Sequence, residues 1–484
     1  MQVEKLNNSE KLESLFYPNN IAFIGASPNS SFGSMLYLKD FKDSQWSDSF
    51  YPVNPKHDEI LGWKCYPSVL DIPNEVDTAY ISVKTHIVPK VLQECVEKGI
   101  KWVIIFASGF SETGDHGNAE TEIQLSKIVQ GTPTRIIGPN CLGPYNGIIG
   151  MSFSFAAHPE VGSASFMSQS GGHLSQLLDI GVKRDLRFRY GVSFGNQIDL
   201  NCFHFLRFFR KDPGTKLIAA YLESFGSADG HTFFKELKKT TKIKPVILWK
   251  GGYTQDGSRA AFSHTGAMVS DFKLWKTMAK QTGAVLVRDN EEFWNTIKTF
   301  ELLFPKRIPN GRNVAIITPG GGSSVNMTDL FASYGLNVPV LTQESQNKLS
   351  KTLPKENVNI ANPIDLGASG FVVNIFLKTI KIAVEDPNTD IIVVPLWPHH
   401  IFRYVFKRMV KIQKNTSKPF AFCLPSLADS AELVNRFKIA KKILHKERSL
   451  YFFSLREAAK SIAKFCEYIE FLETRNIRFQ TERD

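Results

Sequence analysis

Several familiar sequence features are missing from this chain of 484 residues. It has no run of 18 or more apolar residues, which argues against a membrane-spanning helix. Its first twenty residues, MQVEKLNNSEKLESLFYPNN, are polar and charged and lack the apolar core of a secretory signal. Its six cysteines are scattered and form no C-x-x-C pair, which argues against a zinc site or a disulfide framework. We therefore expect a cytoplasmic protein with no metal site of its own and no membrane partner.

Motifs of nucleic-acid-binding modules are also missing, since the chain has neither zinc-finger spacing nor an RNP-like aromatic motif. The formal net charge of +11 leaves two interpretations open. It reflects either a Lys-rich background on solvated faces such as FKELKKTTKIK, or a surface for anionic partners such as phosphorylated small molecules. We expect no nucleic-acid partner.

The hydrophobic content of 43% is ample for buried cores, and the length suggests about three domains. Short apolar runs, many of them ending at Gly or a polar residue, alternate with helix-like segments, as in parallel α/β sheets. The fold class predicted is α/β, with three successive Rossmann-like or flavodoxin-like doubly wound parallel-sheet domains. The predicted domains are 1–147, 148–305 and 306–484, the last ending in a charged helical tail over about 455–484. The predicted strands lie in IAFIGA, VDTAYISV, KWVIIFAS and TRIIGPN, then in SASFMSQSGG, FRYGVSFGNQ, LIAAYLES, PVILWKGG and AVLVRD, and then in NVAIITPGGG, GLNVPVL, DIIVVPLW, PFAFCLP and YFFS.

The stretch GASPNSSFG (25–33) follows the first predicted strand and should lead into a helix. Its glycines would let backbone N–H groups approach an anion. The spacing is not G-x-G-x-x-G, and Lys56 stands where a nicotinamide-binding fold would place an acid. A phosphorylated nucleotide such as coenzyme A therefore suits this turn better than a nicotinamide, although an ordinary strand–helix turn remains an alternative.

Two further Gly- and Ser-rich stretches stand between a predicted strand and a predicted helix. They are MSQSGGHLSQLL (167–178) and TPGGGSSVNMTD (318–329). Each would present the N–H groups of a helix start to a phosphate, and the alternative is an ordinary Ser cap. His173 falls inside the first of these helices, where we expect a structural role.

Two residues suggest phosphoryl chemistry. Glu223 ends a predicted buried strand, where a carboxylate needs a partner such as a histidine. His264 lies in SRAAFSHTGAMVSD, a stretch of small residues that predicts an uncluttered loop, and an imidazole there can accept and release a phosphoryl group. A helix cap for Glu223 and a fortuitous histidine are the alternatives. Cys141 has no paired base in the sequence, so we expect it to pack rather than react.

Together these stretches resemble the nucleoside-diphosphate-forming acyl-CoA synthetases, relatives of succinyl-CoA synthetase. The likeness is greatest to the subunit of ADP-forming acetate–CoA ligases that carries the phosphohistidine. The motifs that carry it, in chain order, are YPVNPKHDEILGWKCYPSVLDIP, GFSETG, GPNCLG, SQSGG, GNQIDL, SRAAFSHTGA and NPIDLG. The resemblance implies reversible conversion of an acyl-CoA, phosphate and ADP into a carboxylic acid, coenzyme A and ATP.

The resemblance also implies roles for single residues. His264 would be phosphorylated and Glu223 would orient it. Coenzyme A would be held by Gly25, Ser27, Pro28, Val53, Asn54 and Lys56, with Ser82, Glu112 and Asn140 at its thiol end. Phosphate would be bound by Ser170, Gly171 and Gly172 and by Gly321, Gly322 and Ser323. The sequence PGGGSS departs from the AGGPG-like pattern common in the family, and Gly172 stands where Ala is common.

Relatives that complete the reaction on one chain also carry an ATP-grasp region of roughly 200–250 residues, and no stretch of this sequence supplies one. The resemblance therefore implies a separate ATP-grasp beta subunit that binds ATP or ADP with Mg²⁺, in a heterotetramer. Its other partners would be a small carboxylic acid and its CoA thioester. Two alternatives are a non-catalytic CoA-binding regulatory or scaffold protein of the same fold, and a nicotinamide oxidoreductase, which Lys56 disfavours.

Overall fold

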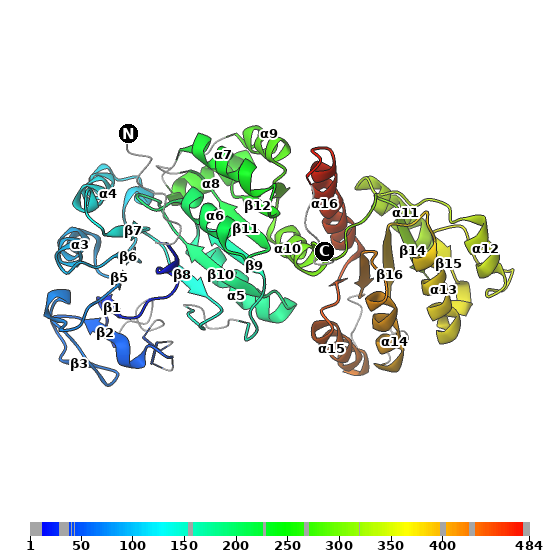
Figure 1. Ribbon diagram of the computed structural model, residues 1–484, viewed down its shortest axis with the longest axis horizontal. Helices are drawn as coiled ribbons and strands as arrows, with labels where there is room; N and C mark the ends of the chain where they lie inside the picture. The colour runs from blue at the N-terminus through cyan, green and yellow to red at the C-terminus, as the bar shows by residue number, and fades with distance from the viewer. Residues whose placement is uncertain are drawn as a thin grey trace. The chain divides into compact units, whose positions relative to one another are not determined.

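The computed structural model describes residues 12–28, 38–39, 41–42, 44–152, 158–225, 229–265, 271–318, 320–396, 403–424 and 431–477. Contacts divide the chain into a first unit, Met1–Arg288, and a second unit, Asp289–Asp484. The first unit contains two large sheets and a two-stranded hairpin, and the second unit contains one sheet (Figure 1). The predicted fold class, three successive α/β domains built on largely parallel sheets, is confirmed, while the predicted domain boundaries stay predictions.

The first sheet has the strand order β2-β1-β5-β6-β7, and all its strands are parallel. Its strands are β1 (Ile21–Ile24), β2 (Phe50–Val53), β5 (Thr78–Ile81), β6 (Trp102–Ile105) and β7 (Arg135–Ile137). Around it lie α3 (Val88–Glu97), α4 (His116–Val129), the hairpin β3 (Glu59–Ile60) and β4 (Trp63–Lys64), and the 3-10 turns η2 (Ser47–Ser49), η3 (Val69–Asp71), η4 (Thr85–Ile87) and η5 (Ser111–Thr113). Most residues of these five strands are buried, as expected for a parallel sheet covered on both faces.

The second sheet has the order β13-β12-β11-β9-β10-β8, with only β8 antiparallel to its neighbour. Its strands are β8 (Gly143–Asn146), β9 (Ala164–Ser168), β10 (Phe188–Ser193), β11 (Leu217–Leu222), β12 (Val246–Lys250) and β13 (Val285–Val287). Its helices are α5 (Gly171–Arg184), α6 (Cys202–Lys211), α7 (Gly230–Thr240), α8 (Gln255–Thr265) and α9 (Phe272–Thr282).

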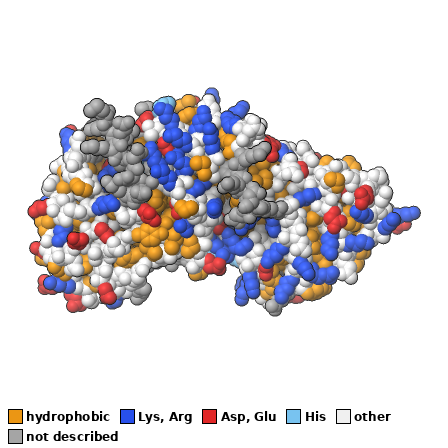
Figure 2. Space-filling model, in the orientation of Figure 1, with side chains coloured by type: hydrophobic (Ala, Val, Ile, Leu, Met, Phe, Trp, Pro, Cys, Tyr) orange, Lys and Arg blue, Asp and Glu red, His pale blue; other side chains and the backbone are white. Residues whose placement is uncertain are grey.

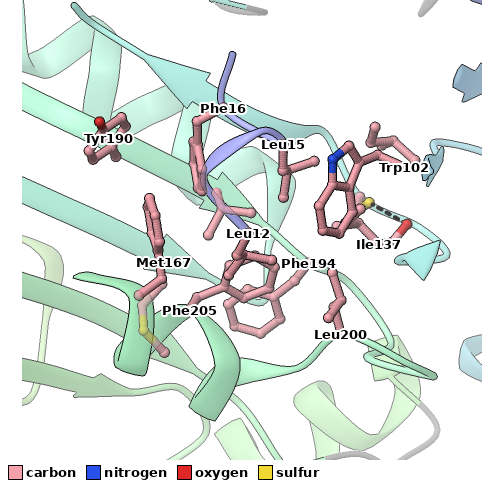
Figure 3. Packing of buried hydrophobic residues seen from close by; sticks show 14 of the residues in the cluster. Leu12, Leu15, Phe16, Trp102, Ile137, Met167, Tyr190, Phe194, Leu200 and Phe205 are labelled. Atoms are coloured by element: carbon pink, nitrogen blue, oxygen red, sulfur yellow. Dashed lines mark hydrogen bonds between the residues drawn. The ribbon is translucent and has the colours of Figure 1, made fainter. Parts of the chain in front are cut away.

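One hydrophobic core joins these two sheets. The N-terminal residues Leu12, Leu15 and Phe16 pack into a cluster that includes Trp102 of the first sheet and Tyr190 of the second (Figure 3). The Phe16 ring lies 5.0 Å from that of Tyr190, centre to centre. The two sheets of the first unit are therefore held together by burial of apolar surface.

A polar connection also joins them. Residues 195–200 lie beside β7, where the N–H groups of Asn196, Ile198 and Leu200 donate to the carbonyls of Pro139, Gly138 and Ile136. The Arg135 guanidinium binds both carboxylate oxygens of Asp199 at 2.6–3.1 Å. This edge segment (195–200) thus continues the hydrogen bonding of the first sheet beyond its last strand.

The second unit contains a parallel sheet of order β15-β14-β16-β17-β18. Its strands are β14 (Val314–Thr318), β15 (Ile364–Asp365), β16 (Ile391–Pro395), β17 (Phe420–Cys423) and β18 (Tyr451–Phe452). Its helices are α10 (Asn290–Leu303), α11 (Gly321–Ser333), α12 (Gln343–Ser350), α13 (Val373–Glu385), α14 (Arg403–Lys414), α15 (Ala431–Lys446) and α16 (Leu455–Glu473), with the 3-10 turn η6 (Gly367–Phe371).

One strand prediction for this unit is wrong. GLNVPVL forms no strand apart from a single bridge at Asn337, and the edge position is taken instead by β15, in NPIDLG. The helix predicted at the end of the chain is confirmed over its described part as α16, whose apolar side chains pack against α10 and α11.

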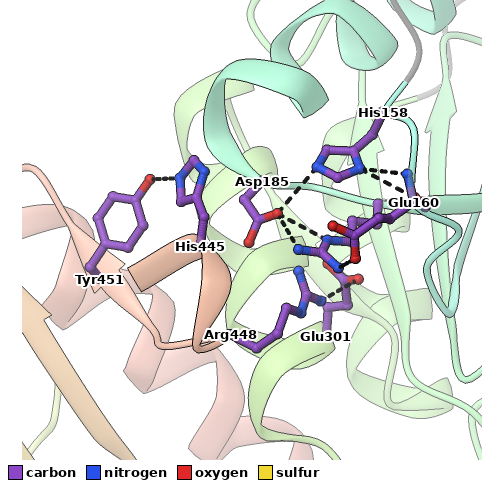
Figure 4. A network of polar contacts seen from close by, with 8 residues as sticks. His158, Glu160, Asp185, Glu301, His445, Arg448 and Tyr451 are labelled. Carbon is purple, nitrogen blue, oxygen red and sulfur yellow. Dashed lines mark hydrogen bonds and ion pairs between the residues drawn. The ribbon is translucent and has the colours of Figure 1, made fainter. Parts of the chain in front are cut away.

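Polar networks fix the ends of elements within each unit (Figure 4). In the first unit the Asp185 carboxylate, which is almost fully buried after α5, accepts from Arg187 and lies 3.3 Å from the His158 ring. In the second unit Arg448 pairs with Glu301 of α10 at 2.7 Å, and the His445 ring hydrogen-bonds the Tyr451 hydroxyl at 2.7 Å. The Arg448–Glu301 pair thus fixes α10 to the loop that precedes β18.

Candidate functional site

The predicted coenzyme A residues gather at the carboxyl edge of the first sheet. Gly25 follows β1, and its N–H donates to the Val53 carbonyl at 2.9 Å. The N–H of Ser82, which follows β5, donates to the Ile24 carbonyl at 2.8 Å. Gly25 has φ +91, and a Cβ there would lie 2.2 Å from the Ser82 carbonyl oxygen, so only glycine fits. The close approach leaves backbone polar groups at the edge where α/β sheets bind ligands.

The turn after β2 adds an exposed cation to this edge. The Asn54 side-chain amide donates to the Ala26 carbonyl at 2.7 Å, and its oxygen accepts the Lys56 N–H at 3.0 Å. Lys56 itself is exposed, and Ser27 and Pro28 are half-buried beside it in sequence order after β1. Residues 29–37 lie outside the described residues, so the helix predicted after this turn stays a prediction.

Glu112 and Asn140 lie on two loops of the same edge, together with a residue of the second sheet. Glu112, in η5, accepts the Gly109 N–H at 2.6 Å, and the Asn196 side-chain amide donates to it at 2.7 Å. The same amide donates to Glu122 of α4 at 2.5 Å. Burial raises the pKa of Glu122, and the Asn196 hydrogen bond opposes that rise. Asn140 has φ +58, and its N–H bonds the Ala107 carbonyl at 3.0 Å.

The first predicted phosphate-binding stretch, MSQSGGHLSQLL, contains the start of a helix, as expected. Ser170 caps α5, and its hydroxyl accepts the His173 N–H at 3.3 Å. A Cβ on Gly171 would lie 2.9 Å from Leu142, whereas a Cβ on Gly172 would meet only the Ser170 hydroxyl oxygen, at an ordinary contact distance of 3.8 Å. The helix start is therefore confirmed as geometry, while phosphate binding there stays a prediction.

Glu223 lies directly after β11 and is 6% exposed. The Tyr221 hydroxyl donates to its carboxylate at 3.0 Å, and burial beside this carboxylate raises the pKa of Tyr221. The Gln169 side-chain oxygen accepts the N–H groups of Glu223 and Ser224 at 2.9 and 3.0 Å. Gln169 precedes Ser170, so the backbone at Glu223 is tied to the start of α5.

Lys250 is a residue that the sequence interpretation missed. It ends β12, next to β11 in the sheet, and is 1% exposed. Its ammonium donates to the Gly251 carbonyl and lies 5.5 Å from the centre of the Trp275 ring. Burial lowers the pKa of Lys250 to about 8, against the opposing influence of the Glu223 charge. A lysine that closes the apolar run PVILWK is the signal that could have found it.

The loop predicted around His264 is, in its first part, a helix. Residues 255–265 form α8, which begins after Thr254, whose hydroxyl accepts the Gly257 N–H at 3.0 Å. Arg259 and Asp256 pair at 2.7 Å one turn apart, and the alanines of SRAAFSHT favour helix. The His264 side chain and residues 266–270 lie outside the described residues. Helix α8 packs against η5, which brings its chain to the GFSETG loop.

The other predicted helix start lies in the second unit. Gly321, Gly322 and Ser323 form the first turn of α11, and Gly320 before them offers no side-chain cap. A Cβ on Gly322 would meet no atom within 4 Å, so this turn is open. Its phosphate role stays a prediction.

Cys141 and His173 have the packing environments expected of them. The Cys141 thiol is 3% exposed and donates weakly to the Ile137 and Ile105 carbonyls, and burial raises its pKa, which disfavours a nucleophilic thiolate. The His173 ring lies 4.2 Å from that of Tyr221 and 4.7 Å from that of Trp249.

Among the described residues no group of three or more His, Cys, Asp or Glu side chains could hold a metal ion. In the same part of the chain no helix is both long and apolar enough to cross a membrane.

Comparison with known proteins identifies the family. Residues 19–146 match the CoA binding domain, and residues 161–300 match the succinyl-CoA ligase like flavodoxin domain. The chain is 36% identical over 382 residues to the alpha subunit of acetate–CoA ligase [ADP-forming] II of Pyrococcus furiosus, covering 79% of this chain and 81% of that one. The chain belongs to the ADP-forming acyl-CoA synthetase family.

Other relatives support the same family. Acetate–CoA ligase [ADP-forming] I of Archaeoglobus fulgidus is 35% identical over 388 residues, which cover 80% of this chain and 55% of that relative. The dinucleotide forming acetyl-coenzyme A synthetase 1 of Ca. Korarchaeum cryptofilum, solved in complex with phosphate and ADP, superposes with a TM-score of 0.82 at 28% identity over 97% of this chain and 99% of that chain. The chain thus spans little more than half of one synthetase and nearly the whole of another chain.

Proposed function

We propose that this chain is the coenzyme A-binding, phosphohistidine-carrying subunit of an ADP-forming acyl-CoA synthetase. A phosphate oxygen attacks the thioester carbonyl carbon, the C–S bond breaks, and coenzyme A leaves as a thiol once it has taken a proton. The ring nitrogen of His264 then attacks the phosphorus of the acyl phosphate and displaces the carboxylate. Finally an ADP oxygen takes the phosphoryl group from nitrogen to form ATP, and every step is reversible.

Each predicted residue has a part in this scheme. Glu223 holds the tautomer of His264 and supports its positive form. The two helix starts stabilise the phosphoryl oxygens through backbone N–H groups, which is the main catalytic contribution expected in phosphoryl transfer. The phosphates and pantetheine arm of coenzyme A are held by Gly25, Ser27, Pro28, Val53, Asn54 and Lys56, and its thiol end by Ser82, Glu112 and Asn140; phosphate is held by Ser170, Gly171 and Gly172 and by Gly321, Gly322 and Ser323.

One observation supports this function above the others. Helix α8, which contains His264, starts beyond β12 of the second sheet and packs against η5 at the carboxyl edge of the first sheet. The chain segment that would carry phosphate therefore runs from the Glu223 side to the Glu112 side of the first unit. A nicotinamide oxidoreductase would give no role to this histidine-containing segment. The comparisons give no support to a non-catalytic scaffold.

Nucleotide binding is assigned to a second chain. We propose that an ATP-grasp beta subunit binds ADP or ATP with Mg²⁺ and forms a cytoplasmic heterotetramer with this chain. Relatives named as alpha subunits support a partner of this kind.

Phosphorylation of the chain tests the proposal. With the ATP-grasp partner and γ-labelled ATP, the wild-type chain should acquire acid-labile, base-stable label, and His264→Asn should acquire none while still binding coenzyme A. His231→Asn, an exposed histidine on α7, is the matched control and should label normally. Label retained by His264→Asn would assign the phosphoryl group to another residue and overturn the scheme.

A further inference from the structure

The positive charge of the chain is concentrated on three helices. Helices α13, α14 and α15, of 13, 12 and 16 residues, contain twelve Lys or Arg residues and two Glu. Their net +10 is nearly the whole +11 of the chain, although they make up less than a tenth of its length. A Lys-rich background spread evenly would have placed about one net charge there, so this surplus is local.

The three helices lie side by side on one face of the sheet in the second unit. Each connects two parallel strands in the same direction across the sheet, from β15 to β16, β16 to β17 and β17 to β18. Right-handed crossovers in one direction put their helices on one face, and α13 contacts α14, which contacts α15. Figure 2 shows Lys and Arg side chains, with hydrophobic side chains between them, over the part of this unit where Figure 1 places these helices.

Two grooves flank α14 on this face. The groove between α13 and α14 has a volume of about 770 Å³, and that between α14 and α15 about 720 Å³. Lys411 and Asn415 line both and form the ridge between them. The exposed cations along the two grooves are Lys378, Lys381, Lys407, Arg408, Lys414, Lys442 and Lys446.

The floors of the grooves are apolar. Leu377, Val384 and Ile412 line the first groove, and Val410, Ile439 and Ile443 line the second. Leu377, Val410 and Ile412 are buried, at 3%, 4% and 9% exposed, and lie below the charged rims, whereas Ile439 is 38% exposed. Among the residues lining the grooves the carboxylates are Glu385 and Glu447, and the Lys414 ammonium beside Glu447 lowers the pKa of that carboxyl.

We propose that this basic face (α13, α14 and α15) docks an acidic, amphipathic protein surface, and that the surface belongs to the nucleotide-binding partner chain. Charge complementarity selects an acidic partner, and recessed aliphatic floors accept protruding apolar side chains. A bilayer surface would need a continuous stripe of protruding apolar side chains, but among the residues that line the grooves Ile439 is the exposed aliphatic one. A phosphate backbone would leave the apolar floors uncovered. The identity of the partner rests on the proposed function.

Charge reversal tests this docking surface. Lys407→Glu/Lys411→Glu should weaken binding to the ATP-grasp chain at least 30-fold in 50 mM salt, and Lys442→Glu/Lys446→Glu should do the same from the other rim. Lys235→Glu/Lys238→Glu, with the same change in net charge on exposed positions of α7, is the control and should stay within 3-fold of wild type. Wild-type binding should weaken steeply with salt and the reversed variants should lose most of that dependence. Unchanged circular dichroism spectra and unchanged urea unfolding transitions of every variant verify that both units are folded.

The outcomes separate the two proposals. ATP formation with the partner, together with wild-type affinity in both rim variants, would overturn the docking surface and leave the function standing. No phosphohistidine in the wild-type chain would overturn the function, while the affinities still measure docking. Tighter binding at 150 mM salt to a 30-nucleotide RNA or to vesicles containing 30% phosphatidylserine than to the partner would also overturn the docking surface.

Discussion

At the scale of single residues, Lys250 shows most directly how burial shapes the candidate site. Its ammonium is removed from water at the end of β12, near the carboxylate that the proposed chemistry uses. A lowered pKa means that the unfolded chain holds this proton more tightly than the folded chain does. Between about pH 8 and pH 10.5, Lys250 therefore makes the free energy of unfolding rise with pH.

Lys250→Met should remove this dependence. At pH 7 the variant should be more stable than wild type by about 1–3 kcal/mol, because a charged group is no longer buried. The difference should shrink as the pH approaches 10, and urea unfolding of both proteins at pH 7, 8.5 and 10 measures it. Comparison at each pH cancels the contribution of the buried Lys244, whose pKa is also lowered to about 8. A stability difference between the two proteins that does not change with pH would contradict the lowered pKa of Lys250.

Lys56 should contribute to the binding of coenzyme A through a phosphate contact. It is exposed at the carboxyl edge of the first sheet and is free to reach a ligand, because its backbone alone is fixed by Asn54. Lys56→Ala should weaken coenzyme A binding about 10- to 150-fold, the equivalent of a charge-assisted hydrogen bond. Calorimetry with coenzyme A and dephospho-coenzyme A distinguishes the contacts: a smaller loss for the latter assigns Lys56 to the 3′-phosphate, and no loss for either would remove its role.

At the scale of elements, the edge segment depends on a glycine. Gly195 has φ +52, and a Cβ there would lie 2.0 Å from the Pro139 carbonyl oxygen. Gly99 also has a positive φ, of +78, but a Cβ there would meet nothing within 4 Å. An alanine at Gly99 would therefore experience backbone strain alone, whereas an alanine at Gly195 would experience the same strain and a steric collision.

Gly195→Ala should therefore cost more stability than Gly99→Ala. The control should lose roughly 1–2 kcal/mol from left-handed strain alone, and Gly195→Ala at least about 3 kcal/mol. Denaturant unfolding of both variants measures the difference. Equal losses would show that the edge segment moves aside at little cost.

Elements also show which parts of the fold the sequence can predict. Buried runs such as IAFI and LIAAYL are strands as expected, because a parallel strand covered on both faces is apolar throughout. GLNVPVL is also rich in apolar residues but is not a strand, since apolar content does not fix which segment occupies the sheet edge. The small residues of SRAAFSHT predict a loop, yet alanine is also the best helix former, and the segment is helical.

In the candidate site, too, some features could be predicted from the local sequence and others depend on how the sheets pack. The positions of Gly25, Ser170 and Glu223 could be predicted, because Gly25 and Glu223 directly follow an apolar strand and Ser170 lies two residues after one, at the edge where parallel sheets place their ligands. Asn196 and Tyr221 could not, since their roles come from contacts with Glu112 and Glu223 that only the packed sheets create.

At the scale of the whole molecule, the chain should be inactive by itself. Its length is taken up by three α/β sheets, and no ATP-grasp region is evident in its sequence. Acetyl-CoA, phosphate, ADP and Mg²⁺ with this chain alone should give no ATP in a luciferase assay, and addition of the ATP-grasp chain should restore formation. The partner alone is the control, and sustained turnover by this chain without it would refute the division of labour.

The edge segment beside β7 has a consequence for how the chain could be divided. Residues 195–200 belong in sequence to the second sheet but cover the open side of the last strand of the first. A fragment cut near residue 150 would leave β7 with unpaired backbone groups and Arg135 without its carboxylate. The unpaired backbone groups of such an exposed edge strand can form hydrogen bonds with a strand of another chain, so the excised coenzyme A domain would tend to self-associate. The six residues thus protect the first sheet against aggregation, and they follow β10, in the middle of the sequence that forms the second sheet.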